Sequence, residues 1–102
     1  MGGGFTKAGL SEIKIPVFLV VGEADKVTPA STNAQHYAKL TRGAKLKILP
    51  GDVSHYTFLA ECNSRGRTML DICRDATSVD RAQVHKQVAQ MAFEFFEKGG
   101  KR

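Results

Sequence analysis

The sequence lacks a long hydrophobic run. Its longest continuous apolar stretch, Val17–Val21, is far too short to span a lipid bilayer. The N-terminus also lacks the charged segment followed by an apolar segment that is typical of a secretory signal peptide. We therefore expect no membrane association and, for the chain as written, a cytoplasmic location. A longer parent protein remains open to a periplasmic or secreted location.

A compact basic surface is also missing, although the formal net charge is +5. The basic residues are scattered over residues 7–47, 65–74 and 98–102 and form no compact stripe interleaved with aromatic residues. This pattern is typical of a solvated surface, so no nucleic-acid partner is expected. No pair of Cys or His residues has zinc-finger or His-x-x-x-His spacing, and no metal or other cofactor is predicted.

The chain is short for a complete α/β enzyme. Its 102 residues form one domain at most, whereas a doubly wound α/β fold normally needs considerably more. Apolar residues make up 42% of the sequence and charged residues 25%, which is the composition of a globular chain. We therefore expect residues 1–102 to form a single portion of a larger domain.

Two segments have the pattern of β-strands. Residues 15–21 form a continuous, β-branched apolar run, as in a strand buried on both faces of a parallel sheet. Residues 45–49 alternate between apolar side chains and lysines, which favours an edge or near-edge strand. Between them, Thr28 and Pro29 have the pattern of a helix N-cap and first turn, and Gly43 is expected to end that helix. The pattern predicts a β-α-β unit with parallel strands.

Two helices are predicted after the second strand. The first covers residues 56–61, and a longer one begins near Thr77, with Asp80 completing a capping box, and runs to about Lys98. One face of the longer helix is apolar at helical spacing, through Val84, Val88, Met91 and Phe95, with Ala92 and Phe96 widening the stripe. This face must pack on the sheet or on a partner. The predicted fold class is therefore α/β, a βαβ unit followed by a short helix and a C-terminal amphipathic helix. In this arrangement the first strand would have an exposed face and an unpaired edge.

Two cysteines, Cys62 and Cys73, flank a polar stretch that has the composition of a loop. A disulfide closing this loop would stabilise the fold by about 3 kcal/mol in an oxidising compartment. Two reduced structural cysteines fit the sequence equally well.

An acid and a base follow the two strands. Asp25 comes shortly after the first strand and His55 shortly after the second, so parallel pairing brings both loops to one end of the sheet. A carboxylate that accepts the Nδ1 proton of an imidazole fixes its tautomer and leaves Nε2 free to take a proton from a nucleophile. We therefore predict Asp25 and His55 as catalytic residues. The alternative is a solvated Asp25 beside an ordinary turn histidine.

Residues 15–29 and 44–51, together with His55, resemble the C-terminal part of an α/β-hydrolase, and the similarity extends over most of the chain. Segments 54–62, 72–75 and 80–85 are similar to the group of predicted dienelactone hydrolases. The resemblance implies that Asp25 and His55 are the acid and base of a Ser-His-Asp triad acting in ester, lactone or related acyl hydrolysis of a small molecule. It also favours a disulfide between Cys62 and Cys73.

The nucleophile that this family carries upstream, on a Gly-x-Ser-x-Gly elbow, is absent from the sequence, as is the oxyanion loop. Ser54 adjoins His55, but neighbouring side chains in an extended loop point apart. Cys62 lies at the end of a predicted helix without an oxyanion hole. We therefore expect the chain to be inactive alone. The alternative is a non-enzymatic homo-oligomer that buries the first strand and the face from Val84 to Phe95 against a second copy.

Overall fold

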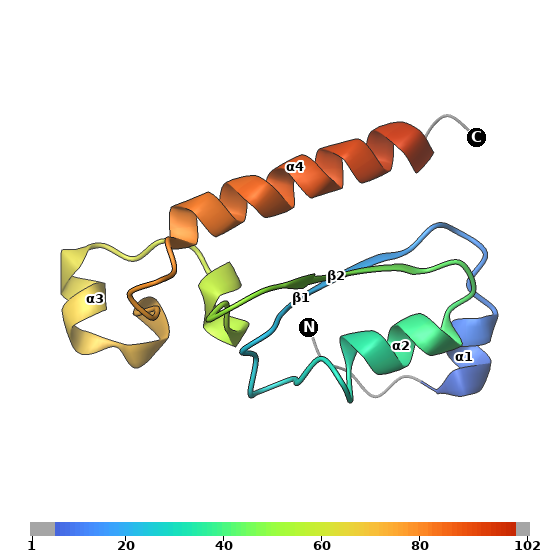
Figure 1. The fold of residues 1–102 in the computed structure, drawn as a ribbon, viewed down its shortest axis with the longest axis horizontal. Coiled ribbons are helices and arrows are strands. Elements are labelled where there is room, and N and C mark those ends of the chain that lie inside the picture. Colours follow the sequence, from blue (N-terminus) through green and yellow to red (C-terminus); the bar gives the residue numbers. More distant parts are fainter. Residues whose placement is uncertain (1–5, 100–102) are drawn as a thin grey trace.

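The computed structural model describes residues 6–99. Its elements in chain order are α1 (Lys7–Ser11), β1 (Phe18–Gly22), α2 (Ala34–Leu40), β2 (Lys45–Leu49), the 3-10 helix η1 (His55–Phe58), α3 (Ser64–Met69), the 3-10 helix η2 (Asp71–Cys73) and α4 (Arg81–Gly99). β1 and β2 pair in parallel, with Phe18 opposite Lys45 and Gly22 opposite Leu49. The chain is thus a small α/β fold, and the predicted β-α-β unit is present (Figure 1).

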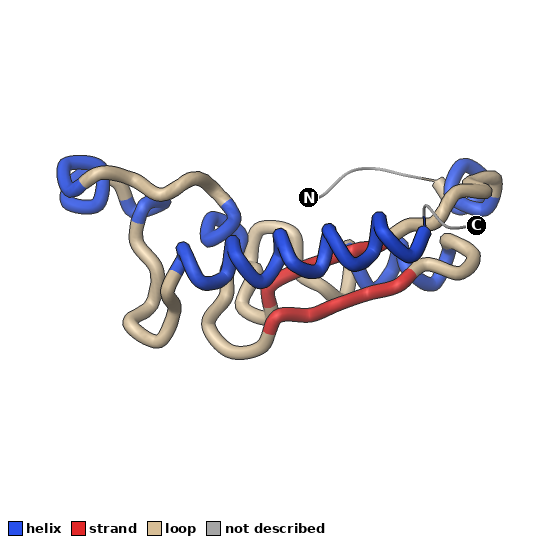
Figure 2. Tube along the Cα trace, turned by 90° about the horizontal axis from the view of Figure 1, so that it is seen from above, coloured by secondary structure: helices blue, strands red, loops and turns tan. Residues whose placement is uncertain are grey.

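Helices lie on both faces of the two-stranded sheet. On one side α2 packs against the strands and α1 against α2, while α4 runs along the opposite side (Figures 1 and 2). The core between the sheet and α4 consists of apolar side chains, namely Leu49 of β2, Val53 of the loop after β2, and Val84, Val88 and Met91 of α4. Phe18 of β1 and Phe95 of α4 meet edge to face, with 5.5 Å between the ring centroids. The predicted apolar face of the last helix therefore packs on this chain's own sheet.

Two phenylalanines of α4 lie outside this core. Phe93 is 63% exposed and Phe96 is 71% exposed. Phe96 therefore lies outside the part of the stripe that packs on this chain's own sheet, although its neighbour Phe95 contacts Phe18 of β1.

β1 begins at Phe18, whereas the sequence pattern placed the start of the strand at Ile15. Ile15 is 72% exposed, and Pro16 has no N–H group to donate to a neighbouring strand. The ladder begins where the Lys45 N–H group donates to the Val17 carbonyl group, at 3.0 Å. β2 spans the predicted residues, and the exposed lysines confirm its alternation.

The crossover helix α2 begins at Ala34, so the N-cap predicted at Thr28 and Pro29 is wrong. The Thr28 hydroxyl group donates instead to the Asp25 carboxylate, at 3.1 Å, and turns closed by the Pro29 carbonyl group precede the helix. Gly43 has a φ of +71°, in the left-handed region that glycine tolerates, and follows the end of the helix.

The segment between the cysteines is more regular than the predicted loop. Cys62 and Cys73 form a disulfide, so of the two predicted states the structure contains the oxidised one. α3 and η2 occupy the segment, and the Asn63 side chain caps α3 by accepting a hydrogen bond from the Gly66 N–H group at 2.8 Å. This local cap is the reason that a polar stretch forms a helix.

α4 begins at Arg81, whereas a start near Thr77 was predicted. The Val79 N–H group closes a preceding turn, so the chain is not helical there. Asp80 accepts a hydrogen bond from the Gln83 N–H group at 3.3 Å. Asp80 is therefore the cap itself and not the second member of a capping box.

The molecule is elongated. Its principal extents are 44 × 29 × 20 Å and its radius of gyration is 15.1 Å, compared with about 13 Å for a compact domain of this length. None of the helices between residues 6 and 99 has both the length and the apolarity that a bilayer crossing requires.

Candidate active site

The carboxyl ends of β1 and β2 remain paired beyond the strands themselves. The Glu23 N–H group donates to the Leu49 carbonyl group at 2.8 Å, and the Ala24 N–H group donates to the Val53 carbonyl group at 2.9 Å. A Cβ atom on Gly22 would lie 2.2 Å from the Val53 carbonyl oxygen, so glycine is required for this approach. The two loops that carry the candidate acid and base are thereby held side by side.

The predicted contact between Asp25 and His55 is present. Nδ1 of His55 lies 3.0 Å from Oδ2 of Asp25. The Asp25 side chain is 3% exposed and the His55 side chain is 27% exposed. The alternative of a solvated aspartate beside an unrelated turn histidine is therefore wrong.

Asp25 accepts four hydrogen bonds. Its Oδ1 accepts from the N–H groups of Val27 and Thr28, at 2.9 and 2.8 Å, and its Oδ2 accepts from the Thr28 hydroxyl group and from His55. Burial alone would raise the pKa of Asp25, but the hydrogen bonds from the Thr28 backbone, from His55 and from the Thr28 hydroxyl group lower this pKa below its ordinary value. The carboxylate is therefore ionised at neutral pH and acts only as an acceptor.

An ionised Asp25 determines the tautomer of a neutral His55. Because the carboxylate cannot donate, Nδ1 must carry the ring proton that forms the 3.0 Å hydrogen bond. Nε2 is then an unprotonated acceptor, and no hydrogen bond to it is formed by any residue in the range 6–99. This is the state in which an imidazole can act as a general base.

Thr28, which was predicted to cap a helix, is instead a member of the site. Its Oγ1 lies 3.1 Å from Oδ2 of Asp25 and 3.2 Å from Nδ1 of His55, so it contacts both partners. The spacing Asp-x-x-Thr, in which an aspartate side chain accepts hydrogen bonds from N–H groups two and three residues later, is a signal that could have identified this turn.

The pair lies beside an open cavity of about 340 Å³. Five apolar residues line it together with Asp25 and His55, namely Val20, Val21, Phe58, Leu59 and Val88. The Tyr56 ring meets the imidazole edge to face, with 5.1 Å between the ring centroids. The His55 ring therefore contacts an aromatic neighbour and borders an apolar cavity.

The other residues weighed from the sequence lie away from this pair. Ser54 directs its hydroxyl group to Thr57, at 3.2 Å, and Cys62 is consumed by the disulfide, so neither acts as a nucleophile on the base. Glu23 accepts a hydrogen bond from the Gly51 N–H group at 3.0 Å and braces the turn after β2. Among residues 6–99, no group of three or more His, Cys, Asp or Glu side chains is arranged to hold a metal ion.

No protein-family model matches this chain, and comparisons with curated proteins and with solved structures find no match either.

Proposed function

We propose that Asp25 and His55 are the acid and base of a Ser-His-Asp type triad for ester or lactone hydrolysis. In this proposal the chain is the C-terminal part of an α/β-hydrolase, similar to dienelactone hydrolases. The observation that carries the proposal is the 3.0 Å contact between Nδ1 of His55 and a buried carboxylate that is already saturated with donors. Such a carboxylate orients the ring without itself taking the proton.

The chemistry of the pair follows from this orientation. Nε2 of His55 removes the proton of a nucleophilic hydroxyl group as its oxygen attacks the ester carbonyl carbon, and Asp25 stabilises the imidazolium that forms. The imidazolium then donates the proton to the departing alkoxide when the tetrahedral intermediate collapses. Water repeats the same two steps on the acyl intermediate and restores the neutral imidazole.

The nucleophile and the oxyanion hole must come from outside these 102 residues. The sequence contains no Gly-x-Ser-x-Gly elbow, and Nε2 has no hydroxyl or thiol partner in the part of the chain that the structure describes. We therefore propose that the chain alone does not turn over esters.

The test joins the chain to the segment encoded directly upstream of it and assays hydrolysis of p-nitrophenyl acetate and of dihydrocoumarin, a lactone. We expect hydrolysis by the joined protein and a fall in kcat of about 10⁴-fold in the Asp25→Asn and His55→Ala variants. His36→Ala is the matched control, because His36 is an exposed histidine of α2 and its removal should leave kcat unchanged. Activity that survives His55→Ala, or an upstream segment without a nucleophile elbow, would overturn the proposal. If the chain alone hydrolyses these substrates and the His55→Ala variant does not, the proposal that the chain alone is inactive is overturned.

A second candidate is a non-enzymatic homo-oligomer, which is favoured by the exposed Phe93 and Phe96 and by the free edge of β1. The interface would differ from the one predicted from sequence, since the face from Val84 to Phe95 already packs within the chain. Size-exclusion chromatography with light scattering is the test. A monomer at every concentration up to the millimolar range contradicts this candidate.

A further inference from the structure

A polar network with little exposure to solvent begins two residues after His55. Its centre is Thr57 of η1, which is fully buried. The Thr57 hydroxyl group accepts a hydrogen bond from the Ser54 N–H group at 3.1 Å and donates to Oδ1 of Asp75 at 2.7 Å. Nε2 of His85 lies 2.8 Å from the Thr57 carbonyl oxygen. Thr57 is thus held through both its side chain and its backbone, two residues from His55.

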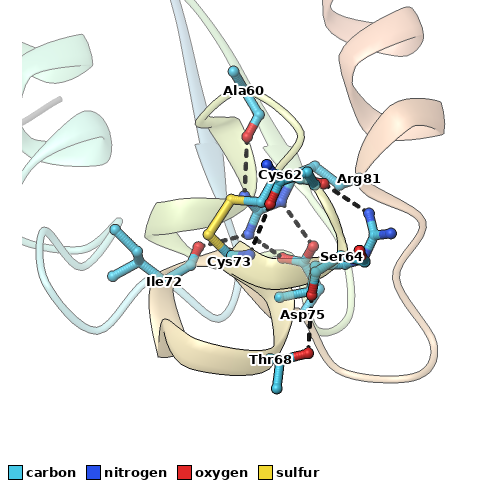
Figure 3. Close-up of a disulfide and its surroundings, with 11 residues drawn as sticks. Ala60, Cys62, Ser64, Thr68, Ile72, Cys73, Asp75 and Arg81 are labelled. Atoms are coloured by element: carbon cyan, nitrogen blue, oxygen red, sulfur yellow. Dashed lines mark hydrogen bonds and ion pairs between the residues drawn. A yellow bond between two sulfur atoms is a disulfide. The ribbon is translucent and has the colours of Figure 1, made fainter.

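Asp75 is held in turn by Arg81 at the start of α4. Nε of Arg81 donates to Oδ2 of Asp75 at 2.9 Å, and the two side chains are 7% and 9% exposed. A second guanidinium nitrogen donates to the Ile72 carbonyl group at 2.8 Å, next to the disulfide (Figure 3). Burial alone would raise the pKa of Asp75, but the hydrogen bonds from Arg81 and Thr57 and the positive charge of Arg81 lower it below its ordinary value.

This network is an unusual way to stabilise a fold. A buried ion pair gains little over apolar residues of the same volume, because both charges lose their hydration. The network contacts η1, a four-residue turn with little intrinsic stability. The imidazole on this turn must stay within hydrogen-bond distance of Asp25, so η1 needs support from outside. Every buried side-chain nitrogen and oxygen among residues 6–99 has a partner, so the network is complete as it stands.

We propose that Arg81, acting through Asp75 and Thr57, positions His55 against Asp25. Arg81 is a positioning residue and not a catalytic one, since two hydrogen-bonded contacts and the backbone of η1 separate it from the imidazole. The proposal rests on the proposed function for its catalytic meaning. The forked guanidinium is required because it binds Asp75 and the Ile72 carbonyl group at once, which a lysine ammonium group cannot do with the same geometry.

The experiment follows the Nδ1 proton of His55 by ¹H and ¹⁵N NMR in the full 102-residue chain. In the wild-type protein we expect a downfield, slowly exchanging Nδ1 proton and an unprotonated Nε2. Thr57→Val keeps the shape of the side chain and removes its hydroxyl group, and Arg81→Lys keeps the charge and removes the fork. Each should accelerate exchange of the Nδ1 proton with water by about tenfold or more. Thr57→Ser retains the hydroxyl group and should retain the wild-type rate.

A stability control separates positioning from a general loss of fold. Leu10 is buried in α1, which lies near the opposite end of the two-stranded sheet from η1 (Figure 1). Leu10→Ala should lower the overall stability and leave the Nδ1 proton as slow as in the wild-type protein at temperatures where the chain is folded. If Arg81→Lys does not fold, the comparison of Thr57→Val with Thr57→Ser decides the question.

Three results would overturn the proposal: a folded Arg81→Lys protein with the wild-type Nδ1 exchange rate, a Thr57→Val protein with that rate, or an equal acceleration in Leu10→Ala. Ester hydrolysis plays no part in this measurement, so its outcome is separable from that of the proposed function. The Nδ1 proton could respond as expected while the joined protein hydrolyses esters without His55. That result would support the positioning of His55 by Arg81 and would contradict the proposed hydrolase function.

Discussion

The side chains of Asp25 and Asp75 are only 3% and 9% exposed, and each binds a basic side chain. Burial by itself would raise the pKa of each group, but the hydrogen bonds that each accepts lower it below its ordinary value. Protonation is therefore harder in the folded than in the unfolded chain. The resulting stabilisation is fully present above the unfolded pKa of about 3.9 and is lost as the pH falls through the lower, folded value.

This linkage predicts a pH dependence of unfolding. We expect the free energy of unfolding, measured in urea, to decrease as the pH is lowered from about 5 to 3. The decrease should be smaller in Asp25→Asn, because one of the two perturbed carboxylates is gone. Asp71→Asn is the control, since the Asp71 side chain is 98% exposed and should leave the slope as it is in the wild-type protein. A slope that is the same in Asp25→Asn and wild type would contradict the prediction.

At the scale of the elements, the end of β1 packs closely against the loop that follows β2, where the backbone of Gly22 contacts the Val53 carbonyl group. Gly22→Ala would place a Cβ atom 2.2 Å from the Val53 carbonyl oxygen, and backbone atoms can yield little. We expect a loss of about 1–3 kcal/mol in the free energy of unfolding. In Gly9→Ala the nearest atom is the Thr6 hydroxyl oxygen at 3.2 Å, so this helical control should unfold within about 0.5 kcal/mol of wild type. If Gly22→Ala and Gly9→Ala had the same free energy of unfolding, the steric explanation would be refuted.

The disulfide defines a second element-level prediction. Replacing Cys62 and Cys73 by serine should lower the free energy of unfolding by about 3 kcal/mol, because the unfolded chain regains the freedom of the closed loop. Hydrogen exchange should increase mainly in residues 61–75. A reducing agent should produce the same change in the wild-type protein and none in the double variant. No loss of stability on reduction would mean that α3 and η2 hold the loop without the bond.

The sequence predicted what short-range patterns determine. The apolar run and the alternating run identified β1 and β2, helical periodicity identified the inner face of α4, and the position of two loops after parallel strands brought Asp25 and His55 together. The helix cap predicted at Thr28 was wrong, because the hydroxyl group that could cap a helix is more strongly bound by the nearby carboxylate.

The buried polar network could not be predicted in the same way. Thr57, Asp75 and Arg81 are separated along the chain, and polar residues in such segments normally face solvent. Their burial depends on the disulfide and on the docking of α4, which are tertiary features that no local pattern encodes. The exposure of Phe96 was likewise not predictable, because its helical position fits the apolar stripe but its ring is 71% exposed in the folded chain.

At the scale of the whole molecule, two strands and an elongated shape leave apolar surface uncovered, as expected of a portion of a larger hydrolase under our proposal. Phe93→Glu and Phe96→Glu should change the free energy of unfolding by less than about 0.5 kcal/mol, since both rings are already exposed. Any concentration-dependent association seen by light scattering should weaken in these variants. Phe95→Ala is the contrasting variant, because its ring packs on Phe18 and its loss should cost about 2 kcal/mol. If association is unchanged in Phe93→Glu and Phe96→Glu, the surface of contact between copies lies elsewhere on the molecule.

One β-α-β crossover carries the aspartate, the histidine and the glycine-dependent join that sets their separation. The proposed acid and base therefore lie on one continuous stretch of polypeptide, residues 18–55. A recombination event that moved this stretch as one block would transfer both groups together, but it would leave behind Thr57, Asp75 and Arg81, which we propose position His55.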